Sequence, residues 1–458
     1  MISFRRKHYD YDLIVFGSGS GGSVAAHYAQ SIGKKVAIFE AEAVGGECPN
    51  YACVPTKAVL HASRVYETVQ NAKQYGINVG EVDVNYHAVK RWKDLVVSRT
   101  GASHGKASFE KEGIHLIHQK AVFVSPHEVQ SGGKIYSAAK FLIATGASNF
   151  VPPITGLEET GYISSQEAID LEKAPGSIMI FGGGAVGCEF AQIFASFGTK
   201  VTMVIRGDRV LNKEDQEVSD LVKALFENQG IKILTDTSVI KVEKKDHKKV
   251  VHFHSKEKDS VVEFDELLIA AGKRGNLDFH PEKAGIVIEK GRLHVNRHLL
   301  TNVPHIAAAG DVVGPYLFTH TASYQSYIAG TNLFSRDKVS VDYDVVPRCV
   351  FVSPEVASVG ISEQDAIEKG IPIKKGIMAI GMLGRANTAN DFDGFVKVIT
   401  DKKGVIIGSS IVAPRAGEMI HELALAIQCR IKAETVANMI HAYPTYSEGV
   451  KIACSLVS

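Results

Sequence analysis

Two cysteines separated by four residues are the feature of this chain most suggestive of chemistry. Cys48 and Cys53 lie in the run Gly-Gly-Glu-Cys-Pro-Asn-Tyr-Ala-Cys at residues 45–53. Such a pair can cycle between dithiol and disulfide, but the spacing also suits half of a zinc site or two buried thiols. No second Cys/His pair at zinc spacing follows, so we predict no metal site. The position of the pair therefore has to decide its meaning.

A dinucleotide-binding pattern comes directly before the cysteines. Residues 12–16 predict a buried strand, residues 23–32 a helix, and residues 36–39 a second strand that ends at Glu40. The glycines of the intervening G-x-G-x-x-G turn are Gly17, Gly19 and Gly22. They permit a tight turn and close approach of a pyrophosphate to the helix N-terminus, while the acid can bind a ribose hydroxyl. A disulfide in this place would lie next to a bound dinucleotide, as electron transfer through sulfur requires.

The same pattern recurs later in the chain. Residues 177–181 predict a strand, residues 188–197 a helix and residues 201–205 the next strand. The glycines of this second turn are Gly182, Gly184 and Gly187. Two dinucleotide sites in one chain suggest two cofactors with electrons passing between them.

The two patterns differ where the ribose is read. The first has Glu40, whereas the second has Ile205 followed by Arg206, with Arg209 close by. An acid binds a 2′-hydroxyl and repels a 2′-phosphate, and an arginine does the reverse. We therefore predict that the second site prefers NADPH, with NADH possible. The alternative is that Arg206 is a solvated surface residue.

Three further turns fit this architecture. Apolar strands run into small-residue turns at 141–146 and 267–272, and these would be the exits of the two nucleotide units. The turn residues assigned to the cofactor sites are Thr145, Gly146 and Gly272. At residues 301–311 a strand and a glycine precede Asp311, which could bind a polyol such as a flavin ribityl chain or cap a helix.

The composition is that of an ordinary globular protein of two to four domains. The 458 residues are 45% hydrophobic and 22% charged, with a net charge of +1 and six cysteines. This balance indicates neither a nucleic-acid partner nor a secreted disulfide scaffold. No apolar run is long enough to span a bilayer, and residues 1–11 lack a signal-peptide core, so a cytoplasmic location is expected. Cys188, Cys349 and Cys429 are expected in the core.

The C-terminal part has a different texture. Strands are predicted at 395–400 and 405–412, and helices at 418–428 and 433–440. No glycine fingerprint occurs here, so we predict a third domain of the α+β type, ending in the run His-Ala-Tyr-Pro-Thr-Tyr-Ser-Glu-Gly at 441–449.

Taken together, these motifs resemble those of the flavin-containing pyridine nucleotide–disulfide oxidoreductases. The resemblance spans nearly the whole chain and rests on GSGSGG, GGECPNYACVPTK, GGGAVGCEF, AAAGD and YPTYSEG. It implies an α/β fold with two Rossmann-like dinucleotide-binding domains, for FAD and for NAD(P)H, plus a C-terminal α+β dimerisation domain. The implied ranges are 1–148 and 276–344 for a discontinuous FAD-binding domain, 149–275 for NAD(P)H and 345–458 for dimerisation of a homodimer.

The resemblance also implies roles for single residues. Cys53 would be the thiolate beside the flavin, and Cys48 the interchange thiol that meets the acceptor. Lys57 and Glu189 match a pair that lies near the flavin in relatives, although either alone could be a surface charge. His320 follows Asp311 where relatives line the flavin, and is more often a packing residue.

One departure from the family pattern concerns the acid–base group. Dihydrolipoamide dehydrogenase and glutathione reductase have a histidine before the C-terminal proline, whereas this chain has Tyr443; Glu448 is retained. His441 stands two residues earlier and is not the matching residue. A tyrosine pKa near 10 leaves little base at neutral pH, which disfavours fast reduction of lipoamide or glutathione disulfide.

Mercuric reductase is similar at this position, since it also has an aromatic residue before the proline. A metal ion held by thiolates needs no proton from a histidine. The vicinal C-terminal cysteines of that enzyme are missing here, where Cys454 stands alone. The leading prediction is that electrons pass from NADPH through FAD and Cys48–Cys53 to a metal ion or small thiol-reactive acceptor. The alternatives are direct transfer from flavin to a quinone, oxygen or second nicotinamide, a dihydrolipoamide dehydrogenase, and a non-catalytic flavoprotein subunit.

Overall fold

The computed structural model describes residues 8–100, 105–255 and 258–458, which form two compact units. The first unit is discontinuous in sequence and comprises Met1–Thr56, Arg91–Phe150 and Lys273–Val341. The second comprises Lys57–Lys90, Val151–Gly272 and Asp342–Ser458.

The first unit is built on a parallel sheet that continues into an antiparallel hairpin. The parallel strands, in spatial order, are β3 (His115–Ile117), β2 (Val36–Phe39), β1 (Tyr11–Phe16), β6 (Lys134–Ile143) and β18 (Ile306–Ala308). The long strand β6 also pairs antiparallel with β5 (Glu128–Ser131), which pairs with β4 (Val122–Ser125). β1 is buried throughout except Asp12, as expected for a strand with both faces covered.

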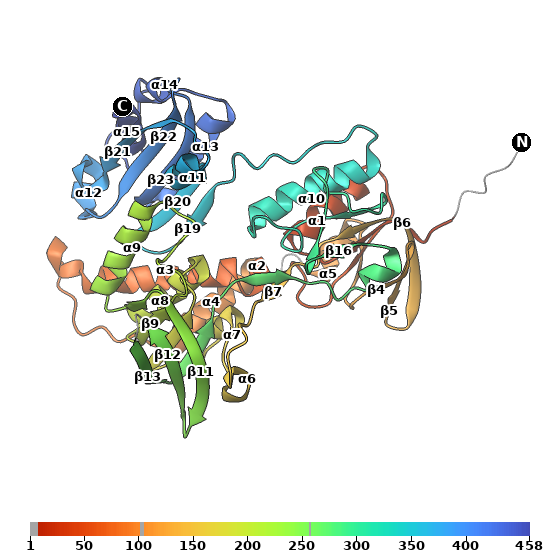
Figure 1. Ribbon diagram of the computed structural model, residues 1–458, viewed down its shortest axis with the longest axis horizontal. Coiled ribbons are helices and arrows are strands. Elements are labelled where there is room, and N and C mark those ends of the chain that lie inside the picture. The colour runs from red at the N-terminus through yellow and green to blue at the C-terminus, as the bar shows by residue number, and fades with distance from the viewer. Residues whose placement is uncertain (1–7, 101–104, 256–257) are drawn as a thin grey trace, which may run out of the picture. The chain divides into compact units, whose positions relative to one another are not determined.

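Two helices lie side by side against this sheet, α1 (Ser20–Ser31) and α10 (Thr319–Phe334) (Figure 1). Small residues allow them to approach closely: a Cβ on Gly330 would lie 3.0 Å from the Cβ of Ala25. Further elements of this unit are α2 (Glu47–Asn50), α5 (Lys106–Lys111) and the strand pairs β7 (Ala147–Asn149) with β15 (Lys273–Gly275) and β16 (Ile288–Glu289) with β17 (Arg292–Leu293). Helices α3 (Cys53–Gln70) and α4 (Tyr86–Thr100) each contain a boundary between the units.

The second unit begins its own parallel sheet with the second glycine pattern. Its order is β10 (Lys232–Leu234), β9 (Lys200–Val204), β8 (Ser177–Phe181) and β14 (Glu266–Ile269). Around it are α6 (Leu157–Thr160), α7 (Ser165–Ile169), α8 (Ala185–Ser196) and α9 (Gln216–Asn228). A three-stranded antiparallel sheet follows, made of β11 (Thr237–Lys245), β12 (Lys248–Ser255) and β13 (Lys258–Phe264) (Figure 1).

The C-terminal part of the second unit is an antiparallel sheet with helices. The strand order is β19 (Arg348–Val350), β20 (Glu355–Gly360), β23 (Ile406–Ala413), β22 (Phe395–Asp401) and β21 (Ile373–Ala379). Helix α13 (Ala416–Gln428) packs on β20 and β23, and α15 (Glu448–Ser455) on β21 and β22. The remaining helices are α11 (Glu363–Glu368), α12 (Gly384–Ala389) and α14 (Ala433–Ala437).

Four predicted helix boundaries differ by two or more residues, among them the start of α13, which is Ala416 rather than residue 418. The helices after the two glycine turns begin at Ser20 and Ala185, three residues earlier than expected, because their glycine-rich first turns are already helical. Helix α14 ends at Ala437 rather than at residue 440, and Ile440 is 94% exposed. None of the helices in the described residues combines the length and the apolarity needed to cross a bilayer.

Candidate active site

The first glycine turn has a shape that only glycine permits. Gly17 has a φ of +98°, and a Cβ there would overlap the carbonyl of Ala144. A Cβ on Gly22 would overlap the carbonyl of Gly17. Gly19 is the N-cap of α1 and gives its N–H groups no side-chain cap. The turn therefore offers open backbone donors and the positive end of a helix, which fit the pyrophosphate of FAD.

Glu40 is held firmly at the end of β2. Its buried carboxylate accepts hydrogen bonds from the backbone N–H of Ser18 (2.8 Å), the Ser18 hydroxyl (2.7 Å) and the N–H of Glu42 (2.8 Å). A carboxylate has about four acceptor positions, so one remains for a ribose hydroxyl. The Ser18 hydroxyl also accepts from the N–H of Gly45 at 2.9 Å, which ties this position to the loop that carries the cysteines.

The exit of the first nucleotide unit is fastened by reciprocal hydrogen bonds. The Thr145 hydroxyl donates to the Asn276 carbonyl at 2.8 Å, and the Asn276 amide donates to the Thr145 carbonyl at 2.9 Å. The N–H of Asn276 reaches the Gly146 carbonyl at 3.0 Å. These bonds fix the turn of Thr145 and Gly146 without using the Thr145 N–H.

Asp311 lies in a loop that buried Gln325 holds from both sides. The Gln325 side chain accepts from the N–H of Gly310 and donates to the Gly314 carbonyl, both at 2.7 Å. Burial raises the pKa of the Asp311 carboxyl; the nearby Lys273 opposes this shift and Glu47 adds to it. Asp311 does not cap the following helix, since the N-cap of α10 is Phe318. The loop therefore presents a desolvated acid that suits the polyol of FAD.

The second glycine turn repeats the first. Gly182 has a φ of +120°, and a Cβ on it would overlap the Ala270 carbonyl. A Cβ on Gly187 would overlap the Gly182 carbonyl, and Gly184 is the uncapped N-cap of α8. Gly272, with a φ of +111°, follows the neighbouring strand β14. This turn fits the pyrophosphate of a nicotinamide dinucleotide.

The position after β9 differs from its counterpart after β2. Ile205 is buried against the turn, where a Cβ on Gly183 would lie 2.6 Å from its Cδ1. Arg206 is exposed. Arg209 lies along its own loop, bonded to the Gln216 side chain at 2.6 Å, and its buried Nε has no hydrogen-bond partner among the described residues. The loop after β9 thus carries two guanidinium groups, one exposed and one held within the loop.

The two cysteines of the C-x4-C pair have different surroundings. Cys48 lies in the short helix α2, directly after Glu47, whose carboxylate pairs with Lys273. Cys53 is the first residue of α3, and its sulfur lies 3.5 Å from the Thr319 hydroxyl at the start of α10. Both cysteines are half-buried. No sequence motif marks Thr319, because a threonine at a helix start is ordinary.

Lys57 and Glu189 form a partly buried ion pair. The Lys57 ammonium lies 2.9 and 3.1 Å from the two carboxylate oxygens, and Glu189 is 5% exposed. Phe351 serves both partners: its N–H donates to Glu189 at 3.0 Å, and its ring centroid lies 4.6 Å below the Lys57 ammonium. Neither residue is a solvated surface charge, so that alternative is wrong. The contacts of Phe351 with this ion pair were not predicted.

A second ion pair fixes the strand region around Phe351. The Arg64 guanidinium pairs with Glu355 at 3.2 Å and donates to the carbonyls of Phe351 (3.0 Å) and Val352 (3.1 Å). Glu355 also accepts from the N–H of Gly417, the second residue of α13. These bonds hold the backbone around Phe351, which contacts the Lys57–Glu189 pair, in a fixed position.

In the C-terminal motif the tyrosine is exposed to solvent, whereas the histidine is turned inward. Tyr443 is 77% exposed. Glu448 accepts from the N–H of Thr445 at 3.2 Å. His441 turns inward, with its Nε2 3.0 Å from a carboxylate oxygen of Glu422. His320, in the first unit, is exposed and stacks on Phe318.

The remaining cysteines are packing residues with one exception. Cys188 and Cys454 are buried, Cys349 is half-buried, and burial raises the pKa of each thiol, to about 12 for Cys454. Cys429 was expected in the core but is exposed at the end of α13. No group of three or more His, Cys, Asp or Glu side chains in the described residues is arranged to hold a metal ion.

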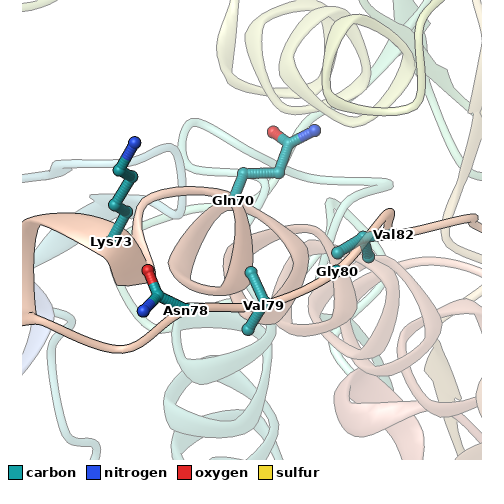
Figure 2. A pocket seen from close by; sticks show the side chains of 6 residues that line it. All are labelled: Gln70, Lys73, Asn78, Val79, Gly80 and Val82. Carbon is teal, nitrogen blue, oxygen red and sulfur yellow. The ribbon is translucent and has the colours of Figure 1, made fainter.

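A hollow of about 420 Å³ lies at the C-terminal end of α3 (Figure 2). It is lined by Gln70, Lys73, Asn78, Val79, Gly80 and Val82. Lys73 is its one ionisable group. The hollow lacks the convergent polar groups of a reaction site.

Comparison with known proteins identifies the family. Residues 11–326 match the model of the pyridine nucleotide-disulphide oxidoreductases, and residues 346–454 match the dimerisation domain of the same family. The chain belongs to this family. The α/β fold with two dinucleotide-binding parts and a C-terminal dimerisation domain is thereby confirmed, as are the cofactor classes FAD and NAD(P)H.

Individual relatives cover almost the whole chain. The mercuric reductase of Bacillus cereus is 32% identical over 452 residues, which are 97% of this chain and 71% of that protein. The dihydrolipoyl dehydrogenase of Bacillus subtilis (strain 168) is 34% identical over 447 residues, or 95% and 94% of the two chains. Among solved structures, the HOCl-induced flavoprotein disulfide reductase RclA from Escherichia coli has a TM-score of 0.88 at 28% identity, covering 98% of this chain and 100% of that one. A Cu(II) complex of RclA matches with a TM-score of 0.89.

The protein is therefore an FAD-dependent NAD(P)H oxidoreductase with a redox-active disulfide. When bound, FAD supplies a two-electron carrier between the nicotinamide and the thiols.

Proposed function

We propose that this enzyme uses NADPH to reduce the Cys48–Cys53 disulfide, and through it a thiol-binding metal ion such as Hg(II) or Cu(II). The proposal assigns NADPH to residues 149–275, FAD to 1–148 with 276–344, and homodimer formation to 345–458. Its expected setting is the cytoplasm, where thiols stay reduced.

The observation that carries the proposal is the absence of a suitable base in the C-terminal motif. Tyr443 stands where related disulfide reductases have histidine, and it is exposed without a carboxylate to orient it among the described residues. Glu448 is engaged by the backbone of Thr445, and His441 is engaged by Glu422. Interchange with a disulfide acceptor requires proton transfer to the leaving thiolate, and a tyrosine hydroxyl is a poorer proton donor for this step than the histidine of those relatives.

A metal ion avoids this requirement. Thiolates bind soft metal ions directly, so no proton has to be delivered to the acceptor. The two electrons of one NADPH would convert one Hg(II) to Hg(0), or two Cu(II) to two Cu(I), with release of NADP⁺ and one proton. The mercuric reductase relatives and the Cu(II) complex of RclA support this class of acceptor.

The preference for NADPH rests on the end of β9. Ile205 fills the place of the ribose-binding acid, and exposed Arg206 follows it. A guanidinium matches the planar geometry of a phosphate oxygen pair and repels nothing on the 2′-phosphate. The Asp208 carboxylate lies 3.9 Å from the Arg209 guanidinium, so the negative charge of Asp208 is offset within the same loop.

The test is anaerobic NADPH oxidation with Hg(II) or Cu(II) buffered by excess thiol, beside lipoamide and glutathione disulfide. We expect turnover with the metal ions and little with the disulfides. The Cys48→Ser variant should lose metal-dependent turnover but keep its flavin. Fast lipoamide turnover by the native protein would contradict our interpretation of Tyr443. Undiminished turnover of Cys48→Ser with a quinone or oxygen would instead indicate direct transfer from the flavin.

The Tyr443→His variant sharpens the same test. It restores a group with a pKa near 6.5 at the family position. We expect lipoamide reduction to rise by about tenfold or more, since general acid–base catalysis contributes roughly 10²–10⁴-fold. No rise would show that another feature limits disulfide reduction.

A further inference from the structure

A buried lysine in the C-terminal sheet of the second unit pairs with acids at the start of α9. Lys397 lies on β22 and is 0% exposed. Its ammonium lies 3.2 Å from a carboxylate oxygen of Asp215, 3.1 Å from one of Glu217 and 2.5 Å from one of Glu363. Burial by itself lowers the pKa of Lys397, but the hydrogen bond with Glu363 and the charge of Asp215 outweigh burial and raise it. Lys397 is therefore charged at neutral pH.

Asp215 has the position of a helix cap but different partners. It is the N-cap of α9, yet its side chain makes no capping hydrogen bond to that helix. Its two oxygens accept instead from the N–H of Glu363 at 2.9 Å and from the hydroxyl of Ser410, on β23, at 2.8 Å. Asp215 is 1% exposed, and a buried carboxylate is costly unless it is paired. The start of α9 is therefore held by the C-terminal part of the unit.

The preceding residue makes a second connection of the same kind. Glu214 is 8% exposed and accepts from the guanidinium of Arg348, on β19, at 3.2 Å. It also accepts from the hydroxyl of Ser358, on β20, at 2.5 Å. Two consecutive acids thus bind the end of the loop at 206–215 to the C-terminal sheet.

This loop connects β9 to α9 and carries the two guanidinium groups of the nucleotide-binding part. In its middle, the N–H of Leu211 donates to the carbonyl of Gly183, inside the second glycine turn, at 2.7 Å. The N–H of Glu214 donates to the Leu211 carbonyl at 2.8 Å. Leu211 is buried and has a φ of +46°, a left-handed conformation that leucine rarely adopts. The loop therefore depends on contacts at both ends, with the glycine turn on one side and the C-terminal sheet on the other.

We propose that Lys397 is a positioning residue for the nucleotide site. By pairing with Asp215 it holds the loop at 206–215 against the second glycine turn, and with the loop the guanidinium groups that would meet the 2′-phosphate of NADPH. This inference deepens the proposed function, because it takes this turn and loop to be the NADPH site. Lys397 acts through the loop, since its side chain is wholly buried.

The experiment compares amide hydrogen exchange and nucleotide affinity in the flavin-loaded protein. Lys397→Met nearly keeps the length of the side chain but removes its charge, so the loop opens to let water reach the unpaired Asp215. We expect the peptide covering 206–214, followed by mass spectrometry, to exchange at least about tenfold faster, while β8 at 177–181 stays native. The Kd for NADPH should rise by about tenfold and that for NADH by less than about twofold, because only NADPH has a 2′-phosphate to lose contact with.

Lys375→Met is the matched control. Lys375 lies on the neighbouring strand β21 and pairs with the same Glu363, at 2.6 Å, but among the described residues it does not pair with Asp215 or Glu217. The same chemical change there should leave loop exchange and both affinities native. Equal changes in the two variants would overturn the proposal, since they would trace the effect to Glu363 and not to the start of α9.

Three results for Lys397→Met would also overturn the proposal. These are unchanged loop exchange, a rise that extends equally to β8, and faster loop exchange with unchanged NADPH affinity. If this variant fails to fold, as judged by its flavin content, Asp215→Asn takes its place with the same expected results. One amide oxygen cannot serve all the donors that the two carboxylate oxygens accept, so the end of the loop is again released.

The outcome is separable from that of the proposed function. A native enzyme that binds NADH more tightly than NADPH would contradict the NADPH assignment, and loop exchange in Lys397→Met would still decide whether this lysine holds the loop. A native preference for NADPH, together with an unaffected loop in Lys397→Met, would overturn the inference and leave the proposed function standing.

Discussion

Gly17 and Gly182 begin two turns of nearly identical backbone, with φ angles of +98° and +120°. The helices that follow have Gly19 and Gly184 as N-caps, with φ/ψ of −67°/−176° and −79°/−177°, and neither N-cap makes a side-chain hydrogen bond. In both turns a Cβ on the last glycine would strike the carbonyl of the first. The chain thus builds the same phosphate cradle twice.

The two glycine turns are followed by different residues at the end of the next strand. Glu40 after β2 is a buried acid with three hydrogen-bond donors, whereas Ile205 after β9 is a buried hydrocarbon followed by an exposed arginine. The backbone of each unit supplies what every dinucleotide shares, the pyrophosphate. We propose that the side chains just beyond each strand then distinguish FAD from NADPH.

The largest effect is expected from breaking each cradle separately. Gly22→Ala and Gly187→Ala both place a methyl group against a backbone carbonyl that cannot move cheaply. Gly22→Ala should yield protein with at least about tenfold less bound flavin, while Gly187→Ala should stay yellow but lose NADPH binding by a similar factor. Flavin absorbance per chain and NADPH titration measure the two losses.

Gly80→Ala serves as the control for these two variants, because no atom lies within 4 Å of the added methyl group. It should match the native protein in both measurements. Loss of flavin in Gly187→Ala, with retention in Gly22→Ala, would reverse the assignment of the two sites.

The next effect concerns the choice of nicotinamide. Arg206→Glu replaces attraction for the 2′-phosphate by repulsion, and a charged hydrogen bond is worth about 1.5–3 kcal/mol. We expect kcat/KM for NADPH to fall by at least about tenfold and that for NADH to hold or rise. Steady-state kinetics with one metal-ion acceptor give both values. A native enzyme that already prefers NADH would contradict the assignment.

A smaller effect is expected from Glu40→Gln. The amide keeps the shape of the side chain but faces one of the N–H donors of Ser18 or Glu42 with another donor. Leaving a buried donor unpaired costs about 1–3 kcal/mol, so flavin should bind more weakly and the free energy of unfolding should fall by about this amount. Chemical denaturation followed by flavin fluorescence reports both. Ile205→Val, the counterpart in the second unit, should cost about 1 kcal/mol and leave flavin binding unchanged.

The smallest effect compares the two exits. The first is fastened by Asn276, whose side chain bonds the Thr145 carbonyl and the Ser148 hydroxyl, at 2.9 and 2.7 Å. The second exit consists of Ala270, Ala271 and Gly272 and has no side chain that could do this. Asn276→Ala should lower the free energy of unfolding by about 1 kcal/mol, with NADPH affinity unchanged. Thermal unfolding and NADPH titration test this. A loss of NADPH binding free energy as large as the loss of unfolding free energy would show that the turn at Thr145 and Gly146 and the NADPH site are not independent.

The sequence predicted the strands well and the glycine-turn helices less well. The ranges 36–39 and 177–181 agree with β2 and β8 residue for residue, because buried parallel strands are short apolar runs. The starts of α1 and α8 were missed by three residues, since glycines inside a first helical turn look like loop.

The contacts of the site were harder to predict because they join distant segments. Cys53 and Thr319 are 266 residues apart, and Lys57 and Glu189 are 132 apart. The second pair was expected only through family resemblance, and the first was not expected at all. A threonine has no periodicity or spacing that would reveal a sulfur across the fold.

The most direct test of the account is a thiol count after one equivalent of NADPH under anaerobic conditions. The oxidised protein is mixed with NADPH, quenched by alkylation, and its peptides are measured by mass spectrometry. One NADPH supplies two electrons and one proton, and solvent supplies a second proton, so one disulfide becomes two thiols. We therefore predict alkylation of both Cys48 and Cys53 in each reduced chain. Consumption of NADPH with both cysteines still joined would show that electrons leave the flavin by another route.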